Sequence, residues 1–180
     1  MEKHRNTSKI ALRGLLIALA MVLSWVEAQI PVFTAVPGMK LGLTNLVVLV
    51  ALYRLGSKDA LFLNFVRVLL VGLTFGNMVS FVYSLAGGML SGCLMIILKR
   101  VKWFSVTTVS LAGGVFHNVG QILVAMVILE TSSLIYYLPF LWIGGMVSGI
   151  LIGILGARII KRLPDLDGTW QECVKDHEKK

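Results

Sequence analysis

Charged residues are scarce in this sequence, and their scarcity argues against a soluble domain. Only 14% of the 180 residues are charged, whereas 57% are hydrophobic. A soluble domain of this length needs considerably more charge to cover its surface. The composition therefore indicates an integral membrane protein.

Cysteine and histidine are also rare, and the positions of the few that occur argue against a disulfide or a metal site. Cys93 lies inside an apolar run, and Cys173 lies in the polar C-terminal tail. His4 and His177 lie near the two ends of the chain, so only His117 falls within the membrane region. We therefore expect no bound metal ion and no other cofactor.

Motifs of a self-contained enzyme are missing from the sequence. G-x-S-x-G, H-E-x-x-H and the Walker A motif do not occur, and no cysteine or carboxylate lies near His117 to build a triad. Prenyl-diphosphate chemistry needs clustered carboxylates to hold Mg²⁺. The four aspartates do not form such a cluster: Asp59, Asp165, Asp167 and Asp176. We therefore expect a protein that is not an enzyme and that takes any energy for transport from a partner or an ion gradient.

Long uncharged runs, by contrast, are plentiful and predict membrane-spanning helices. Residues 76–98, 103–129 and 133–157 carry no charge, and each run exceeds the ~18–20 apolar residues that cross a bilayer as a helix. Three less regular spans precede them. We predict an all-α polytopic membrane protein, with a bundle of six transmembrane helices in residues 10–163. The expected helices are about 10–29, 41–55, 59–75, 76–98, 103–129 and 134–160, with an N-terminal segment 1–9, an outer loop 30–40 and a polar tail 164–180.

The basic residues orient this predicted bundle. All of the 17 lysines and arginines except Lys40 and Arg67 lie in or beside the two ends and the alternate loops. This positive-inside pattern places both termini in the cytoplasm. The net charge of +8 then reflects orientation and anionic lipid rather than nucleic acid. A cleaved signal peptide is the alternative for the first span, but Trp25 and Glu27 make a poor cleavage site.

A short glycine motif repeats in the last three predicted helices. It reads GGMLSG at residues 87–92, GGVFHN at 113–118 and GGMVSG at 144–149. Small residues let helices approach closely in lipid, where apolar side chains alone give little drive for association. We predict packing seams at Gly88, Gly92, Gly114, Gly145, Gly149 and Gly153.

The middle copy of the motif replaces Ser-Gly by His117-Asn118. His117 and Gln121 continue a stripe of small and polar residues that are three and four positions apart, namely Thr107, Ser110 and Gly114. A polar side chain in hydrocarbon is unfavourable by several kcal/mol unless it finds a partner, so the stripe must face the bundle interior. Two explanations stay open: hydrogen bonds between helices, or the lining of a polar cavity for a ligand.

Other polar residues favour the cavity, because they gather in the middle and outer half of the predicted membrane region. They are Glu27, Asn45, Asn64 and Arg67. An ionisable residue inside a membrane is a functional-site hypothesis by default, so Arg67 is a candidate ligand contact. The alternatives for Arg67 are a simple ion pair with Glu27 or a side chain that reaches to the interface.

The segment QIPVFTAVPGMKLGLTN, residues 29–45, is irregular and yet apolar. Pro31 and Pro37 forbid a continuous helix. Irregular backbone at membrane depth is tolerated where protein or a water-filled cavity covers it. The segment is either a hydrophobic flap that closes over a cavity, with Phe33 and Lys40 against the ligand, or an interfacial segment that seals the bundle.

The segments MKLGLTN (39–45) and AGGVFHN (112–118), on six short helices, resemble the bacterial Gx transporter family, also labelled heptaprenyl diphosphate synthase component I. The resemblance covers roughly residues 8–163. That family is similar in size and layout to the substrate-binding S components of energy-coupling-factor transporters. The resemblance implies a bacterial cytoplasmic membrane protein with an outer-side pocket under the first loop. It also implies docking, through small residues such as Gly14 and Ala18, to a transmembrane coupling protein with two ATPases.

Three functions are therefore compatible with the sequence, and we favour the first. It is a transporter subunit that captures a small molecule, in which Arg67 and Lys40 contact an anionic or carbonyl group while His117, Asn118 and Gln121 donate or accept directional hydrogen bonds. The second is a non-catalytic membrane subunit that associates with a soluble prenyl synthase in prenyl diphosphate or quinone synthesis. The third is a structural membrane scaffold.

Overall fold

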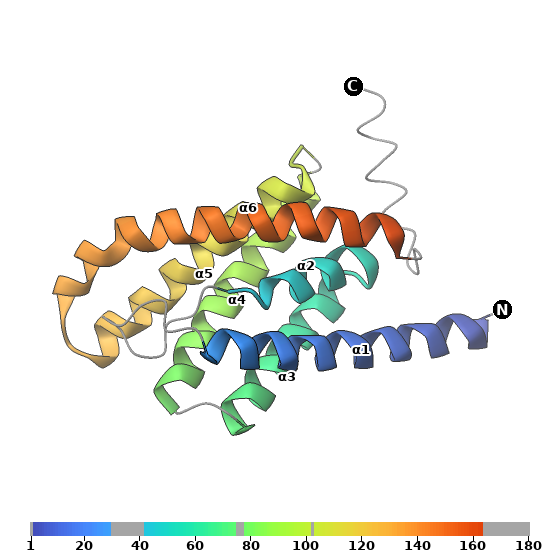
Figure 1. The fold of residues 1–180 in the computed structure, drawn as a ribbon, viewed down its shortest axis with the longest axis horizontal. Coiled ribbons are helices and arrows are strands. Elements are labelled where there is room, and N and C mark those ends of the chain that lie inside the picture. Colours follow the sequence, from blue (N-terminus) through green and yellow to red (C-terminus); the bar gives the residue numbers. More distant parts are fainter. Residues whose placement is uncertain (1, 30–41, 75–77, 102, 164–180) are drawn as a thin grey trace.

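The computed structural model of the chain describes residues 2–29, 42–74, 78–101 and 103–163, and this part of the chain is helical without any strand. The prediction of an all-α fold with six α-helices is confirmed (Figure 1). The predicted outer loop and the polar tail lie outside the described residues. The elements are α1 Glu2–Gln29, α2 Asn45–Arg54, α3 Ser57–Thr74, α4 Met78–Arg100, α5 Val106–Ile128, the 3-10 helix η1 Ser132–Tyr137, and α6 Leu138–Arg162.

The helix starts differ from the sequence-based ranges, most of all in α1, α2 and α6, and α2 begins at Asn45 rather than at residue 41, directly after a turn at residues 43–44. α1 begins at Glu2 rather than near residue 10, because residues 2–9 contain no proline or glycine that would interrupt a helix. α6 begins at Leu138 rather than at residue 134, since Ser132–Tyr137 form a separate 3-10 turn and a proline occupies the first turn of α6. Proline is well tolerated at that position.

Within the described residues, four segments are long and apolar enough to cross a membrane, which indicates a multi-pass membrane protein. They are Lys9–Glu27, Met78–Arg100, Val106–Ile128 and Ser132–Arg162. α2 has only ten residues, and α3 carries three charged residues, so neither meets the same criterion. The topology with six spans stays a prediction.

The helices expose apolar side chains and bury polar ones, the reverse of a soluble protein. Leu73 of α3, Val127 of α5 and Phe140 of α6 are each more than 70% exposed. In the part of the chain that the structure describes, fifteen polar or charged side chains are buried. This distribution fits a bundle whose outer surface faces lipid and whose interior holds polar side chains beside an apolar core.

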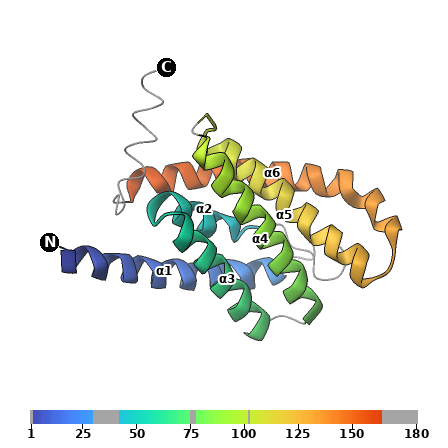
Figure 2. The same ribbon diagram turned by 180° about the vertical axis from the view of Figure 1, so that it is seen from behind.

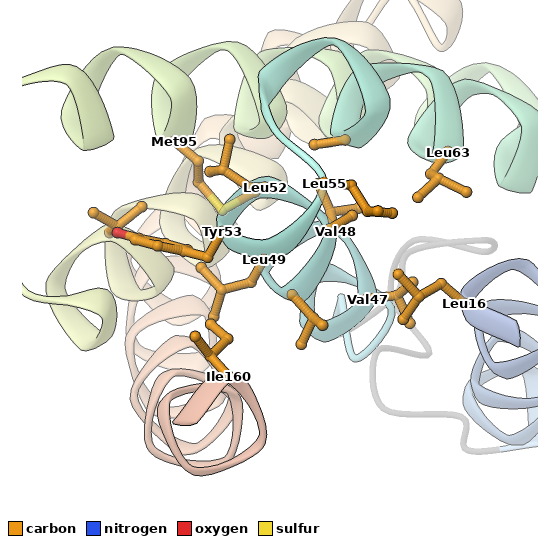
Figure 3. Close-up of a cluster of buried hydrophobic side chains, with 14 of the residues drawn as sticks. Leu16, Val47, Val48, Leu49, Leu52, Tyr53, Leu55, Leu63, Met95 and Ile160 are labelled. Atoms are coloured by element: carbon orange, nitrogen blue, oxygen red, sulfur yellow. The ribbon is translucent and has the colours of Figure 1, made fainter. Parts of the chain in front are cut away.

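The shortest α-helix, α2, forms the centre of the apolar core. Nine of its ten residues are buried. Figure 3 shows its side chains among Leu16 of α1, Leu63 of α3, Met95 of α4 and Ile160 of α6. Ten residues span about 15 Å, roughly half of a bilayer core. Because the residues just before α2 are buried as well, its N-terminal end lies inside the bundle.

α5 and α6 pack with their backbones in direct contact. A Cβ atom added to Gly114 would lie 2.4 Å from the carbonyl oxygen of Gly145, and one added to Gly149 would lie 2.7 Å from Cα of Leu111. Gly153 meets α5 in the same way. The four glycines leave no room for a side chain, so they determine how closely the two helices approach.

The other two predicted packing glycines lie between α3 and α4, which run side by side in Figures 1 and 2. A Cβ atom on Gly88 would lie 3.0 Å from Nδ2 of Asn64, and one on Gly92 would lie 3.2 Å from Cδ2 of Leu61. Gly88 therefore brings the α4 backbone against a polar side chain rather than against another helix backbone.

Cationic side chains bind the C-terminal ends of two helices. Lys99 Nζ, near the end of α4, donates to the carbonyl oxygen of Leu52 at 2.7 Å, and Arg54 donates to the carbonyl oxygen of Ile160. The last carbonyl groups of a helix have no partner within the helix and carry a partial negative charge. These two cations therefore hold the ends of α2, α4 and α6 together.

The turn between α2 and α3 lies at this same end of the bundle. Gly56 has φ +99°, and the N–H groups of Leu55 and Gly56 both donate to the carbonyl oxygen of Ala51, which ends α2. Arg13 of α1 then donates to both carboxylate oxygens of Asp59 at 2.8 Å. In Figure 1 the start of α1, this turn and the end of α6 lie toward the same side of the molecule.

Candidate functional site

Polar side chains from four helices converge around the buried start of α2. We call this set the polar cluster, and each of its members is at most 4% exposed. It consists of Glu27 from α1, Thr44 and Asn45 at the start of α2, Asn64 and Arg67 from α3, and His117 and Gln121 from α5. α4 contributes backbone at Gly87 and Gly88.

Glu27 binds the backbone that leads into α2. Its Oε1 accepts hydrogen bonds from the N–H groups of Gly42 and of Leu43, the latter at 3.2 Å. Because Gly42 is buried at the start of α2, its N–H group needs a protein partner. A carboxylate at the N-terminal end of a helix also interacts favourably with the helix dipole. Glu27 thus allows a helix to start within the membrane region.

The guanidinium group of Arg67 forms hydrogen bonds with two neighbouring side chains and is attracted by the carboxylate of Glu27. Its Nη2 donates to Oδ1 of Asn64 at 2.9 Å, and its Nη1 donates to the hydroxyl of Thr44. The carboxylate of Glu27 lies close enough to attract the guanidinium electrostatically. The buried positive charge is therefore offset by a buried negative charge.

The glycine pair of α4 lets side chains of α3 and α5 lie directly on the α4 backbone. A Cβ atom on Gly88 would lie 3.4 Å from Nη2 of Arg67. A Cβ atom on Gly87 would lie 2.9 Å from Cγ of Gln121 and 3.2 Å from Nδ1 of His117. Any larger residue at these positions would occupy the space that the polar cluster uses.

His117 connects α5 to the start of α2 at Gly42. Gly42 has φ +81°, a conformation that side chains rarely adopt. A Cβ atom there would also lie 3.1 Å from Nδ2 of Asn45 and 3.3 Å from Cδ2 of His117. Gly42 is thus required both by its backbone conformation and by the close packing of two polar side chains against it.

Several polar atoms in this region are buried without a hydrogen-bond partner in the described part of the chain. They include both amide atoms of Gln121, Nδ2 of Asn45, Nε of Arg67, and Oγ of the neighbouring Ser84. A buried polar atom without a partner is uncommon and unfavourable by about 1–3 kcal/mol. A purely structural role would require the Gln121 side chain to form hydrogen bonds with another helix. Among the described residues, it forms none.

The stripe expected on α5 divides between two neighbours. Thr107, Ser110 and Gly114 face the glycines of α6, whereas His117 and Gln121 face α4. Asn118 turns toward α6, because its Nδ2 donates to the carbonyl oxygen of Leu141 at 2.8 Å. The spacing identified the buried side chains, but it did not show that α5 changes its neighbour along its length.

The remaining predicted site residues lie elsewhere. Phe33 and Lys40 fall outside the described residues. Gly14 and Ala18 lie on an exposed face of α1, and a Cβ atom on Gly14 would meet no atom within 4 Å. Among the described residues, no three His, Cys, Asp or Glu side chains come together in a way that would hold a metal ion.

Thr44, Ser84 and Gly87 were not among the residues singled out from the sequence. Thr44 precedes Asn45 in LGLTN, and Gly87 is the first glycine of GGMLSG, so both lay inside segments that had been noticed. Their importance depends on contacts with Arg67 and His117, which are far away in the sequence.

Helices with apolar outer faces closed around a polar cluster define a multi-pass membrane protein with an internal polar site. Residues 16–159 match the family model described as heptaprenyl diphosphate synthase component I. Because this match covers most of the chain, the protein belongs to that family, and the resemblance to heptaprenyl diphosphate synthase component I is confirmed. Searches of the curated proteins and of the solved structures found no match.

Proposed function

We propose that the protein is a membrane subunit that captures a small molecule in the polar cluster, as an S component of an energy-coupling-factor transporter does. The observation that carries this proposal is Gln121, which is fully buried while both of its amide atoms lack a partner among the described residues. Polar side chains within a membrane usually pair with one another or line a site. A bound ligand would provide the missing partners.

The surroundings of the cluster support capture from one side. The cluster lies at the start of α2, directly after the segment that joins α1 to α2. Its polar groups are few and are set among apolar helices, as in most small-molecule sites. The joining segment contains Phe33 and Lys40, which we propose close over the molecule from the outer side.

Energy for inward release would come from a partner. We propose that the exposed face of α1 with Gly14 and Ala18 docks a transmembrane coupling protein that carries two ATPases. No side chain covers Gly14 in the described residues, so a partner helix can approach its backbone closely.

Native mass spectrometry of protein purified gently from its own host tests the proposal. We expect a retained small molecule in the wild-type protein and its loss in His117→Ala. Ser91→Ala is the matched control. Ser91 is also buried, and its Oγ has no partner in the described region. It faces Gly113, one helical turn before His117 on α5, and so lies outside the polar cluster. Wild-type protein without any retained molecule, or equal retention in His117→Ala, would argue against capture at this cluster.

The family description favours a second candidate, a non-catalytic membrane subunit of a prenyl diphosphate synthase. In that case a soluble prenyl synthase should co-purify with the protein, and deletion should lower the quinone content of the membrane. Co-purification of an ATPase module instead would favour the transporter subunit.

A further inference from the structure

The charges of the polar cluster are already balanced among the described residues. Both Nη atoms of Arg67 donate within the protein, to Asn64 and to Thr44, and Glu27 offsets the positive charge. An anionic ligand at Arg67 would have to displace these partners and would lie near the Glu27 carboxylate. The arrangement therefore disfavours an anion at Arg67.

Gln121 instead offers an uncharged pair of groups. Its Nε2 is a donor and its Oε1 is an acceptor, and neither has a partner in the described part of the chain. A rotation of the amide by 180° exchanges the two atoms and leaves the same pair. A ligand satisfies both when it presents an acceptor beside a donor, and an N–H next to a C=O matches the amide edge with two parallel hydrogen bonds. Phosphate and carboxylate groups only accept, so Oε1 would stay unpaired.

Nearby groups add donors for a second ligand atom. Nδ2 of Asn45 and Oγ of Ser84 are buried and have no partner within the described residues. Gly87 and Gly42 bring Gln121, His117 and Asn45 onto adjacent backbone.

On these grounds, and provided that the proposed capture function holds, we infer that the polar cluster selects an uncharged molecule with an amide-like edge. This class includes lactams, cyclic imides and nucleobase-like rings. It excludes prenyl diphosphates as the molecule bound at Gln121.

Two probes test the inference by native mass spectrometry of the full-length protein in detergent: uracil, whose ring edge carries N–H beside C=O, and farnesyl diphosphate. We expect a uracil adduct that is weakened about tenfold or more in Gln121→Met, which removes both hydrogen-bonding atoms and keeps the side-chain length. Ser91→Ala should bind uracil as the wild-type protein does. Farnesyl diphosphate should show no adduct that depends on Gln121.

Failure of the inference and failure of the proposed function give different results. A farnesyl diphosphate adduct that is lost in Gln121→Met, without a uracil adduct, would overturn the inference and leave a capture site of another specificity. Absence of a Gln121-dependent adduct with either probe would also overturn it. The capture function would fail as well only if neither probe gave a Gln121-dependent adduct and the wild-type protein also retained no molecule from its host.

Discussion

At the scale of single residues, the molecule shows how charged groups are accommodated inside a membrane bundle. Arg67 has two hydrogen-bond acceptors and a nearby carboxylate, and Glu27 binds the N–H groups before α2. Neither residue would be stable there alone, because an isolated charge in an apolar interior is strongly unfavourable. Their positions were predictable from the sequence as rare intramembrane charges, whereas the partners Thr44 and Gly42 were not.

The relation between Glu27 and Arg67 predicts non-additive effects on stability. Arg67→Met alone and Glu27→Gln alone should each lower the free energy of unfolding by about 3–5 kcal/mol, because each leaves the other charge without compensation. The double variant should lose clearly less than the sum. Unfolding in detergent measures these values, and strictly additive losses would show that the two charges do not interact.

Gly42 predicts a second effect that belongs to one residue. Gly42→Ala should destabilise the protein by about 1–3 kcal/mol, because it places a side chain at φ +81° and against Asn45 and His117. Gly14→Ala is the control, since a Cβ atom there meets nothing within 4 Å and alanine favours the helix. Thermal unfolding compares the two variants, and equal melting temperatures would contradict the described start of α2.

At the scale of elements, packing between neighbouring helices decides which polar residues meet. The 3.6-residue period showed that His117 and Gln121 are buried, and the glycine motif showed where helices approach closely. The spacing of residues along one helix does not predict the angle at which the next helix crosses it. For this reason the sequence did not reveal that Asn118 faces α6 while His117 faces α4.

The seam between α5 and α6 predicts the effect of one added methyl group. In Gly149→Ala the new Cβ atom would lie 2.7 Å from Cα of Leu111, so the helices must separate and the protein should lose about 1–3 kcal/mol of stability. Val147→Ala changes an exposed residue of the same helix and should have little effect. Similar unfolding curves for both variants would show that the seam is loose.

At the scale of the whole molecule, the uncharged runs and the basic residues predicted the class of protein and its six helices. The ten-residue α2 was the least regular of these spans, and its length alone does not say whether the chain crosses the membrane there. Contacts made by Arg13, Arg54 and Lys99 place the turn between α2 and α3 beside the ends of α4 and α6. These contacts support a crossing by α2 and α3.

Cysteine labelling tests this topology directly. In protein without Cys93 and Cys173, Lys58→Cys should react with an impermeant maleimide only when the cytoplasmic side is accessible, because Lys58 lies in the first turn of α3 at the basic end. Glu130→Cys, between α5 and η1, should react from the outside of intact cells. Labelling of both positions from the same side would contradict the topology with six spans.

The central claim is that Gln121 of the polar cluster is placed for a ligand and not for the stability of the bundle, and the unfolding free energy of ligand-free Gln121→Met tests it most directly. The structure predicts that this variant is as stable as the wild-type protein or more stable by about 1 kcal/mol, because methionine removes a buried amide whose atoms have no partner in the described residues. A loss of more than about 2 kcal/mol would mean that Gln121 holds the helices together, and the cluster would then be a structural network.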